Sequence, residues 1–356
     1  MRTTTARSAR AARWSVLALV LWAAAAAAAP VRHLFQAQVP VTDHSAEQRS
    51  GGIRAAFEEV LVRLTGQSDV TQLPAAQDLL KQPGRFLQQY RYRRHAPADT
   101  ARDATPLWLW VRFDGRALEQ AVRRAGLPLW GRERPRTLIW LAVEDNGRRY
   151  LVSSDDDNDV RARIEQDARR RGVPVLFPLM DLEDQRKVQF ADVWGGFLDV
   201  VVDASKRYNT PNVLVGRLQH TASGSWNARW SMELDNQEHN WQVTDSSLDK
   251  LLAAGVNGAA ERLASRLAVR PGAGGEQAVS LTVEGVHSLQ DYSRVTHYLS
   301  SLTPVQNLAV TRLDGGRLGL SLQLEGDPGT LDQYLALGEV LNKVPDSPQR
   351  VYRLRP

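Results

Sequence analysis

Acidic side chains follow two of the apolar strands that the sequence predicts in the middle of the chain. The five carboxylates at these two points are Glu144, Asp145, Asp181, Glu183 and Asp184. In an open parallel sheet, ligands bind outside the carboxyl ends of the strands, so two neighbouring strands would bring all five carboxylates to one rim. Such a rim could hold Mg²⁺ or Ca²⁺, or supply an acid/base pair for a metal-dependent hydrolase.

A structural role explains the same acids more simply. Strand ends are solvated, and Asp181 or Asp184 can cap the segment that follows. No HExxH motif occurs, and no GxSxG, Walker A or GxGxxG motif stands at a strand-to-helix turn. The acidic run at 155–159 fails the EF-hand pattern because Val160 and Gln166 stand where glycine and glutamate are needed. We therefore assign no catalytic residue, metal ligand or cofactor, and favour a protein that is not an enzyme.

A second candidate pattern mixes aromatic and basic residues in the segment YRYRR, residues 90–94. Its arginines, Arg91, Arg93 and Arg94, could contact an acidic partner, phospholipid headgroups or peptidoglycan. Alternation along a strand offers a plainer interpretation, with the tyrosines facing a core and the arginines lining a solvated face. We favour the plainer interpretation and keep the three arginines as candidate partner-binding residues.

The elements around these candidates predict three small domains of mixed α/β and α+β class. Residues 30–130 read as a β-α-β-β-α unit with helices on one face of its sheet, and the segment 107–113 as its central strand. Residues 136–269 alternate strands and helices and end in an antiparallel hairpin, which predicts a mixed-sheet α/β sandwich. Residues 278–356 give the βαββαβ order of a ferredoxin-like domain. The segments LPLWGRERPR and RPGAGGEQ read as linkers.

One helix within the central domain has the clearest periodicity. Apolar side chains recur at helical spacing through residues 190–208, which predicts one continuous amphipathic helix. Gly195 and Gly196 lie inside it and weaken it by about 1 kcal/mol each. We expect them to permit close packing against the sheet.

The first 29 residues have the three parts of a Sec-type secretory signal peptide. Four arginines without an acid precede the apolar segment 14–22, and small residues then continue to Ala29. The apolar run is shorter than the roughly 18 residues that a membrane span needs, so we expect cleavage among residues 27–29 rather than an anchor. No cysteine follows, which excludes a lipoprotein. The sequence thus predicts a periplasmic protein with no transmembrane segment after cleavage.

Charge and cysteine content exclude further classes of function. The formal charge is +5, from 45 basic and 40 acidic residues. Removing the signal peptide removes four arginines and leaves 41 basic against 40 acidic residues, a charge of +1. A nucleic-acid-binding domain needs a strongly basic face, so we expect no nucleic-acid partner. The chain has no cysteine, which excludes disulfides, thiol nucleophiles and cysteine metal sites.

An ordered set of segments resembles one family, the exported proteobacterial family called domain of unknown function two-thousand-and-sixty-six. The segments are VPVTDHSAEQRSGGIRAAFEEVLVRLTGQSDV, FLQQYRY, LWLWVRFD, LIWLAVED, RRGVPVLFPLMDLED and ASKRYNTPNVLVGRL. The resemblance implies an envelope protein with no established activity and no catalytic residues. The strand and helix order of the first two domains is also similar to envelope assembly proteins of the flagellar outer-ring and curli-secretion groups.

Together these observations favour a non-enzymatic module that acts through contacts with an unidentified envelope protein. The alternative is the metal-dependent hydrolase that would use the acidic rim.

Overall fold

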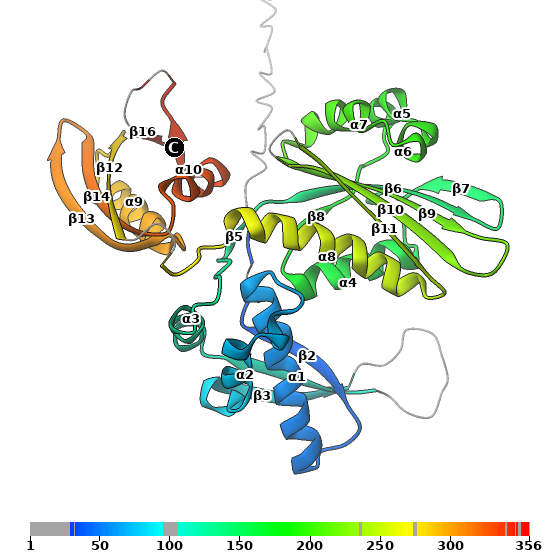
Figure 1. Ribbon diagram of the computed structural model, residues 1–356. Coiled ribbons are helices and arrows are strands. Elements are labelled where there is room, and N and C mark those ends of the chain that lie inside the picture. The colour runs from blue at the N-terminus through cyan, green and yellow to red at the C-terminus, as the bar shows by residue number, and fades with distance from the viewer. Residues whose placement is uncertain are drawn as a thin grey trace, which may run out of the picture.

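The computed structural model describes residues 29–31, 33–94, 106–234, 237–272, 276–338, 340–345, 347 and 350–355 of the 356-residue chain. These residues form ten α-helices and three sheets, together with a strand pair of β1 (Ala29–Pro30) and β5 (Glu133–Arg134) (Figure 1). The predicted class, mixed α/β and α+β in several units, is confirmed. Nearly all of the predicted signal peptide, residues 1–28, lies outside the described residues, and the domain boundaries remain predictions.

The first sheet has three antiparallel strands in the order β2-β4-β3, so the segment predicted as central is indeed the middle strand. Its alternate residues, such as Leu109 and Val111, pack in one cluster with the apolar side chains of the helices. All helices of this unit therefore cover one face, as the sequence predicts. The elements are β2 (Gln36–Val41), α1 (Ala46–Thr65), α2 (Pro74–Leu80), β3 (Leu87–Arg94), β4 (Leu107–Phe113) and α3 (Gly115–Arg124), with 3₁₀ turns at Val70–Gln72 and Pro83–Phe86.

The central sheet is mixed, in the order β11-β10-β9-β6-β7, with β8 also pairing with β6. Strand β6 runs parallel to β9 and β8, and the antiparallel hairpin β10–β11 extends the sheet as predicted. Helices α4 and α8 cover one face, and α5, α6 and α7 cover part of the other (Figure 1). The elements are β6 (Thr137–Asp145), β7 (Arg148–Leu151), α4 (Asp159–Arg171), β8 (Val175–Leu176), α5 (Leu182–Lys187), α6 (Phe190–Gly195), α7 (Leu198–Ser205), the 3₁₀ turn Lys206–Tyr208, β9 (Asn212–His220), β10 (Trp226–Leu234), β11 (Gln237–Asp245) and α8 (Leu248–Leu267).

The continuous helix predicted for residues 190–208 is wrong. Gly196 adopts a left-handed conformation with φ of 75°, and its N–H bonds to carbonyls of α6, so that helix ends there. The chain turns at Phe197, whose side chain is 58% exposed, and α7 begins at Leu198. The glycine that was expected to permit close packing instead divides the apolar stripe between two short helices.

Two further strands differ from the prediction. The expected strand after residue 172 has only two residues, Val175 and Leu176, because the chain leaves the sheet before Pro178. Strand β7 was not predicted, although Asn146-Gly147 joins it to β6. Both residues have positive φ, and Asn-Gly between strands is a strong signal for a tight hairpin.

The third sheet has the order β13-β14-β12-β16-β15. Strands β12 and β16 are parallel and the other neighbouring pairs are antiparallel. The predicted β-α-β-β-α order is present, and β14 lies between β12 and β13 as in a ferredoxin-like sheet. The last part differs, because β16 is inserted between β12 and β15 and runs parallel to β12, where a ferredoxin-like sheet has an antiparallel strand. The elements are β12 (Glu276–Glu284), α9 (Leu289–Ser301), β13 (Val305–Asp314), β14 (Arg317–Glu325), α10 (Pro328–Leu337), β15 (Leu341–Lys343) and β16 (Val351–Leu354).

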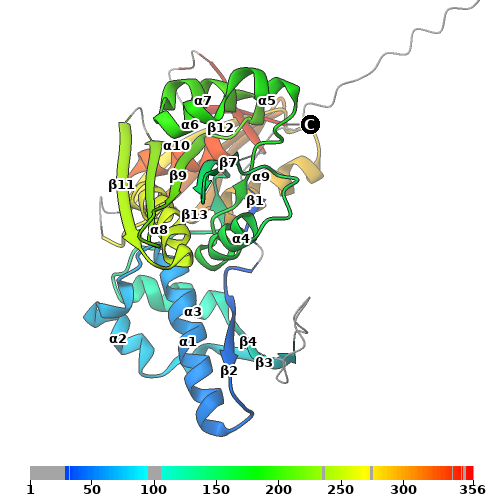
Figure 2. The same cartoon turned by 90° about the vertical axis from the view of Figure 1, so that its right-hand side faces the viewer.

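The segment LPLWGRERPR is a packed junction rather than an exposed linker. Trp130 and Arg134 within it are fully buried, and the Arg134 guanidinium lies 3.8 Å from the centre of the Trp130 ring. The carbonyl ends of α1 and α4 converge here, and Figure 2 shows α1 reaching the layer of α4 and α8. Arg134 donates hydrogen bonds to five carbonyls, those of Arg63, Trp130, Gly131, Arg171 and Gly172.

Electrostatics explains why arginines gather at this junction. The C-terminus of each helix carries a partial negative charge on unpaired carbonyls, and two such ends meet. Arg63 and Arg171, both nearly buried, donate to carbonyls across the same boundary, Arg63 to Arg170 and Arg171 to Gly66. The cations thus satisfy both helix ends and fix α4 against the first sheet.

Among the helices that the structure describes, none has the length and apolar character needed to cross a membrane.

Candidate functional site

The acids at the end of β6 are paired with nearby basic side chains. Glu144 accepts a hydrogen bond of 2.8 Å from Nε of Arg149, its register partner on β7. Asp145 Oδ1 lies 2.8 Å from Nδ1 of His220 and accepts a bond of 3.0 Å from Asn146. Each carboxylate at this edge therefore has a protein partner.

The acids after β8 surround one arginine. Arg207 donates to Asp181 at 2.7 and 2.8 Å and to Asp184 at 2.9 Å, and Glu183 lies 3.7 Å away. Asp184 is fully buried, and it also accepts hydrogen bonds from the Tyr208 hydroxyl and the Met180 N–H. Asp181 is the N-cap of α5. The hydrogen bonds from Arg207 hold the pKa of Asp181 well below its usual range.

The structure therefore divides the predicted acidic rim in two. The two groups have separate partners, because Glu144 and Asp145 contact Arg149 and His220, whereas Asp181 and Asp184 contact Arg207. Arg207 supplies the positive charge at the centre of the second group. Within the described ranges, no three His, Asp or Glu side chains are arranged to hold a metal ion. The hydrolase alternative thus finds no ligand set there.

Sequence reasoning missed the pair of Asp145 and His220. Strands β6 and β9 are parallel with Glu144 opposite Gln219, so the next residue of each strand also meets at this edge. The His220 ring stacks on Trp226 at 4.6 Å between ring centres. Among the described residues, no hydroxyl lies within hydrogen-bond distance of His220, so the pair lacks the serine or threonine of a hydrolase triad. The sequence alone did not show that β6 and β9 are neighbours, and that pairing is the information needed to predict the contact between Asp145 and His220.

The arginines of YRYRR lead to the most developed surface of the molecule. Trp108 and Trp110 alternate with the core residues of β4 and therefore lie on the face of the first sheet opposite its helices. Arg91 pairs in register with Trp110, and Arg93 with Trp108. Both guanidinium groups lie over the Trp110 ring, at 5.9 and 5.5 Å from its centre. This open face, which we call the tryptophan face, carries stacked aromatic and cationic groups.

The structure separates the third candidate arginine from the other two. Arg94 points to the opposite side of β3, where it pairs in register with the buried Leu107. The tyrosines share that side, but only Tyr92 packs at the edge of the core, whereas Tyr90 is 41% exposed. Of the three arginines, two therefore belong to the tryptophan face.

Helix α4 forms a second wall beside this face and creates a groove of about 750 Å³. Gln166, Arg169 and Arg170 project from its exposed side. Arg63 fixes the two walls together, because it donates to the Arg170 carbonyl at 2.7 Å and to the Gln36 carbonyl at 2.6 Å. We call this cavity the sheet–helix groove.

The charge of the sheet–helix groove is unbalanced. Its lining residues include four arginines and one glutamate, Glu59, which lies 2.5 Å from Arg63. Arg169 and Arg170 have only longer contacts of 3.7 Å, with the partly buried Glu165 and Asp167 of α4. Arg93 makes no ion pair within the part of the chain that the structure describes. The groove thus presents one arginine without an ion pair among the described residues and two weakly paired arginines beside indole rings.

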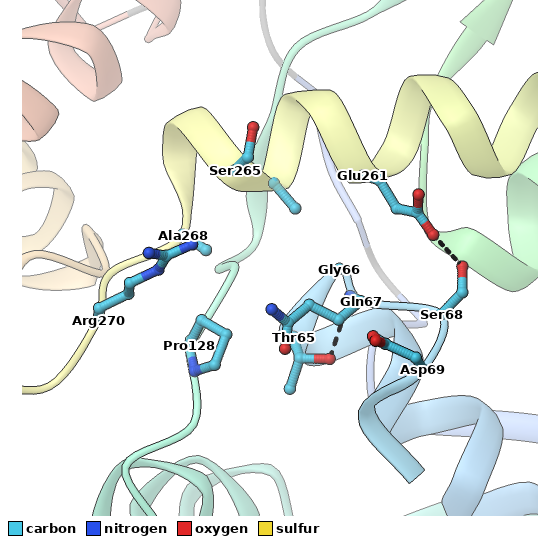
Figure 3. Close-up of a pocket in the computed structure, with 11 residues that line it drawn as sticks. Thr65, Gly66, Gln67, Ser68, Asp69, Pro128, Glu261, Ser265, Ala268 and Arg270 are labelled. Carbon is cyan, nitrogen blue, oxygen red and sulfur yellow. Dashed lines mark hydrogen bonds between the residues drawn. The ribbon is translucent and has the colours of Figure 1, made fainter. Parts of the chain in front are cut away.

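A smaller cleft of about 430 Å³ lies between the end of α1 and helix α8 (Figure 3). The Ser68 hydroxyl donates a hydrogen bond to Glu261, and the Thr65 hydroxyl donates to the Leu61 carbonyl at 2.9 Å. Figure 3 shows Arg270 at the far end, away from that contact. The Ser68–Glu261 bond ties the turn after α1 to α8, whereas the Thr65 bond lies within α1, so we interpret the cleft as part of the junction rather than as a binding site.

Comparison with known families corrects the sequence-based assignment. A family model described as "Domain of unknown function (DUF8605)" matches residues 28–131, less than a third of the chain. The suspected membership of the family called domain of unknown function two-thousand-and-sixty-six was therefore wrong. The segments behind it are amphipathic helices and alternating strands, which burial imposes on many families alike. No curated protein matches the chain. The matched residues include the whole tryptophan face, so this chain is similar to a family of unknown function where its candidate site lies.

Proposed function

We propose that this chain is an exported, non-enzymatic binding protein that holds an acidic, extended segment of an envelope protein in the sheet–helix groove. The observation that carries the proposal is the tryptophan face, with Arg91 and Arg93 over Trp110 and the weakly paired Arg169 and Arg170 on the facing helix. Tryptophan and arginine are the residue types that contribute most to protein interfaces.

The shape and charge of the groove favour an acidic chain. Planar guanidinium groups recognise carboxylates through paired hydrogen bonds, and their surplus attracts an acidic partner from a distance. The half-buried Trp108 and Trp110 add flat apolar surface for the stem of a side chain. Strand β4 has seven residues, so an extended segment of about six or seven residues matches its length of about 23 Å.

The lining residues support binding rather than catalysis. Side chains with a hydroxyl are missing from the described residues around the groove, and His33 is the one histidine among them. General base catalysis on a nucleophile needs both groups within hydrogen-bond reach. The groove therefore has recognition groups without a nucleophile.

We propose export from the sequence of residues 1–29, and the pairing of strand β1 narrows the position at which we expect cleavage. Ala29 and Pro30 pair with Arg134 and Glu133, so a cut after residue 29 would remove half of β1. We expect the mature protein to begin at or before Ala29. Mass spectrometry of the N-terminus, with fractionation of the cells, measures this; a protein with an intact N-terminus in the cytoplasmic fraction would contradict export.

Peptide binding tests the proposed partner. Labelled peptides of seven residues, one rich in glutamate and one with glutamine in its place, are titrated by fluorescence anisotropy. We expect the acidic peptide to bind at least about tenfold more tightly, and Arg93→Ala to remove most of that preference. Arg94→Ala is the matched control, because it removes the same charge from the opposite side of β3. Equal binding of both peptides, or equal loss in both variants, would contradict the proposal.

Crosslinking in the producing cells tests the groove in its own setting. A photoreactive amino acid replaces Trp108, and a control carries it at position 94. We expect one recurrent envelope protein at position 108, attached through an acidic segment, and not at position 94. If position 108 attaches mainly to peptidoglycan or phospholipid, the proposal of a protein partner is wrong and that molecule is the ligand.

A further inference from the structure

A second cationic site lies on the central sheet, away from the sheet–helix groove. Arg217 on β9 and Arg229 on β10 are direct register partners, so their side chains leave the same face of the sheet side by side. Their neighbours in the alternation, Leu218 and Ala228, belong to the core under α4 and α8. The two arginines therefore face the side that carries α5, α6 and α7.

The helical layer on that side ends next to the arginine pair. Arg217 Nη1 donates a hydrogen bond of 2.7 Å to the Trp194 carbonyl at the end of α6, and Gly196 then turns the chain away. Beyond this point β10 and β11 are uncovered, and Arg229 and Gln242 are exposed. The result is a cleft of about 280 Å³ lined by Trp194, Arg217, Gln219, Asn227, Arg229 and Gln242.

No carboxylate balances the two guanidinium groups among the described residues. The lining has two arginines and no acid. Glu144 on β6 lies on the same face opposite Gln219, but it is paired with Arg149, and no ion pair joins it to Arg217 or Arg229. Like charges placed directly opposite each other destabilise a sheet. Burial and the neighbouring Arg229 both lower the pKa of Arg217.

The polar groups of the cleft are mainly donors. Arg229 Nε donates to Gln242 Oε1 at 3.1 Å, and Asn227 Oδ1 accepts from the Thr244 hydroxyl. The amide carbonyls are thus occupied, whereas the amide NH₂ groups of Asn227 and Gln242 make no hydrogen bond to any described residue. The outer guanidinium nitrogens of Arg229 are also without a partner there. Several donors converge on a small cleft without an anion to receive them.

We propose that this cleft binds a phosphate group between Arg217 and Arg229. A tetrahedral dianion relieves the repulsion of the two arginines and accepts hydrogen bonds from both planar forks and from the neighbouring amides. The phosphate can come from a soluble ion or from the headgroup of a phospholipid. Phe197 and Val200, which follow α6 and are 58% and 41% exposed, give an apolar border that would meet a lipid surface.

Phosphate titration of the protein purified from its producing cells tests the site. Inorganic phosphate is compared with chloride at equal ionic strength, and the shift in Tm is recorded. We expect a saturable rise in Tm, with an affinity at least about tenfold weaker in Arg229→Gln. Arg217→Lys keeps the charge but removes the planar fork, and should also bind more weakly. Arg124→Gln on α3 is the matched control and should bind as the original chain does.

A second experiment, vesicle binding, distinguishes the two sources of the phosphate. Vesicles of phosphatidylcholine, with and without phosphatidylglycerol, are sedimented with each variant. All variants keep the same N-terminal segment, so that differences in vesicle binding come from the substituted residue. Binding that needs phosphatidylglycerol and Arg229, and that free phosphate displaces, assigns a phospholipid headgroup. Phosphate binding without vesicle binding assigns a soluble ion. A phosphate affinity that is the same in Arg229→Gln, or no saturable binding to either probe, overturns the site. The acidic-peptide preference of the sheet–helix groove is unaffected by either result.

Discussion

Two charged clusters in this molecule were visible in the sequence, and the fold treats them in opposite ways. The acids Asp181, Glu183 and Asp184 gather around Arg207, which bonds to two of them directly. The arginines Arg91 and Arg93 gather over Trp110 instead, where no carboxylate meets them within the described residues. One cluster is satisfied by the protein itself, and the other has no carboxylate partner among the described residues.

The difference teaches that charge in a sequence does not by itself mark a site. A carboxylate cluster can bind a cation only if no protein cation already occupies its centre, and here Arg207 does. An arginine cluster is a candidate ligand site only if some of its members lack a close counter-charge, as Arg93 does among the described residues. Four predictions test this contrast.

The largest expected effect is on stability, at the acidic cluster. Asp184→Ala removes a fully buried carboxylate from Arg207, Tyr208 and the Met180 N–H. We expect a loss of about 3 kcal/mol in the free energy of unfolding, because a buried ion pair loses one partner. Urea denaturation measures it. Glu183→Ala, at an exposed position of the same helix, is the control and should change stability by less than about 0.5 kcal/mol. A similar small loss for both would show that the cluster is a surface feature.

The next effect is on binding, at the tryptophan face. Arg93→Glu reverses the charge over Trp110. It should weaken the affinity for the acidic peptide by at least about tenfold, since repulsion replaces attraction. The free energy of unfolding should stay within about 0.5 kcal/mol, because the side chain is exposed. Anisotropy and urea denaturation are measured on the same preparations. A loss of stability with unchanged affinity would assign these arginines to the structure rather than to a partner.

A smaller effect is expected in the pH dependence of stability. Arg207 lowers the pKa of Asp181 below its ordinary value of 3.8, so the ionised form stabilises the folded chain. That contribution is complete above this ordinary value and is lost as the pH falls through the folded pKa. Asp181→Asn keeps a helix cap but removes the charge. Its Tm deficit should be constant at neutral pH and shrink below about pH 4. A Tm deficit that is independent of pH would show that Asp181 stabilises the chain only as a helix cap and not through its charge.

The smallest expected effect is that of divalent cations. Mg²⁺, Ca²⁺ or Mn²⁺ at millimolar concentration should shift the Tm of the original chain by less than about 1 °C, because Arg207 already balances the acids. Asp145→Asn and Asp181→Asn serve as comparison variants. A saturable metal-dependent rise in Tm that either substitution abolishes would restore the hydrolase alternative.

Much of the architecture followed from local patterns. The alternation of β4 predicted a middle strand, and the order of elements after residue 278 predicted β12, α9, β13, β14 and α10, because burial on one or both faces imposes the period of the sequence. The prediction of one helix over residues 190–208 was wrong because the apolar period gives no sign of where that helix ends. Its apolar period continues through Gly196, and only the left-handed backbone of that residue shows that the helix ends there.

The sequence by itself determined the strand alternation that places Arg91 and Arg93 on one side of β3 and Arg94 on the other, since side chains alternate along any strand. Tertiary structure alone decided their surroundings. Trp110 meets the two arginines through cross-strand pairing, and Arg207 reaches Asp181 across 26 residues of chain. Which counter-charge lies within a few ångströms depends on contacts that are distant in sequence, and it decides whether a charged cluster is closed or open to a partner.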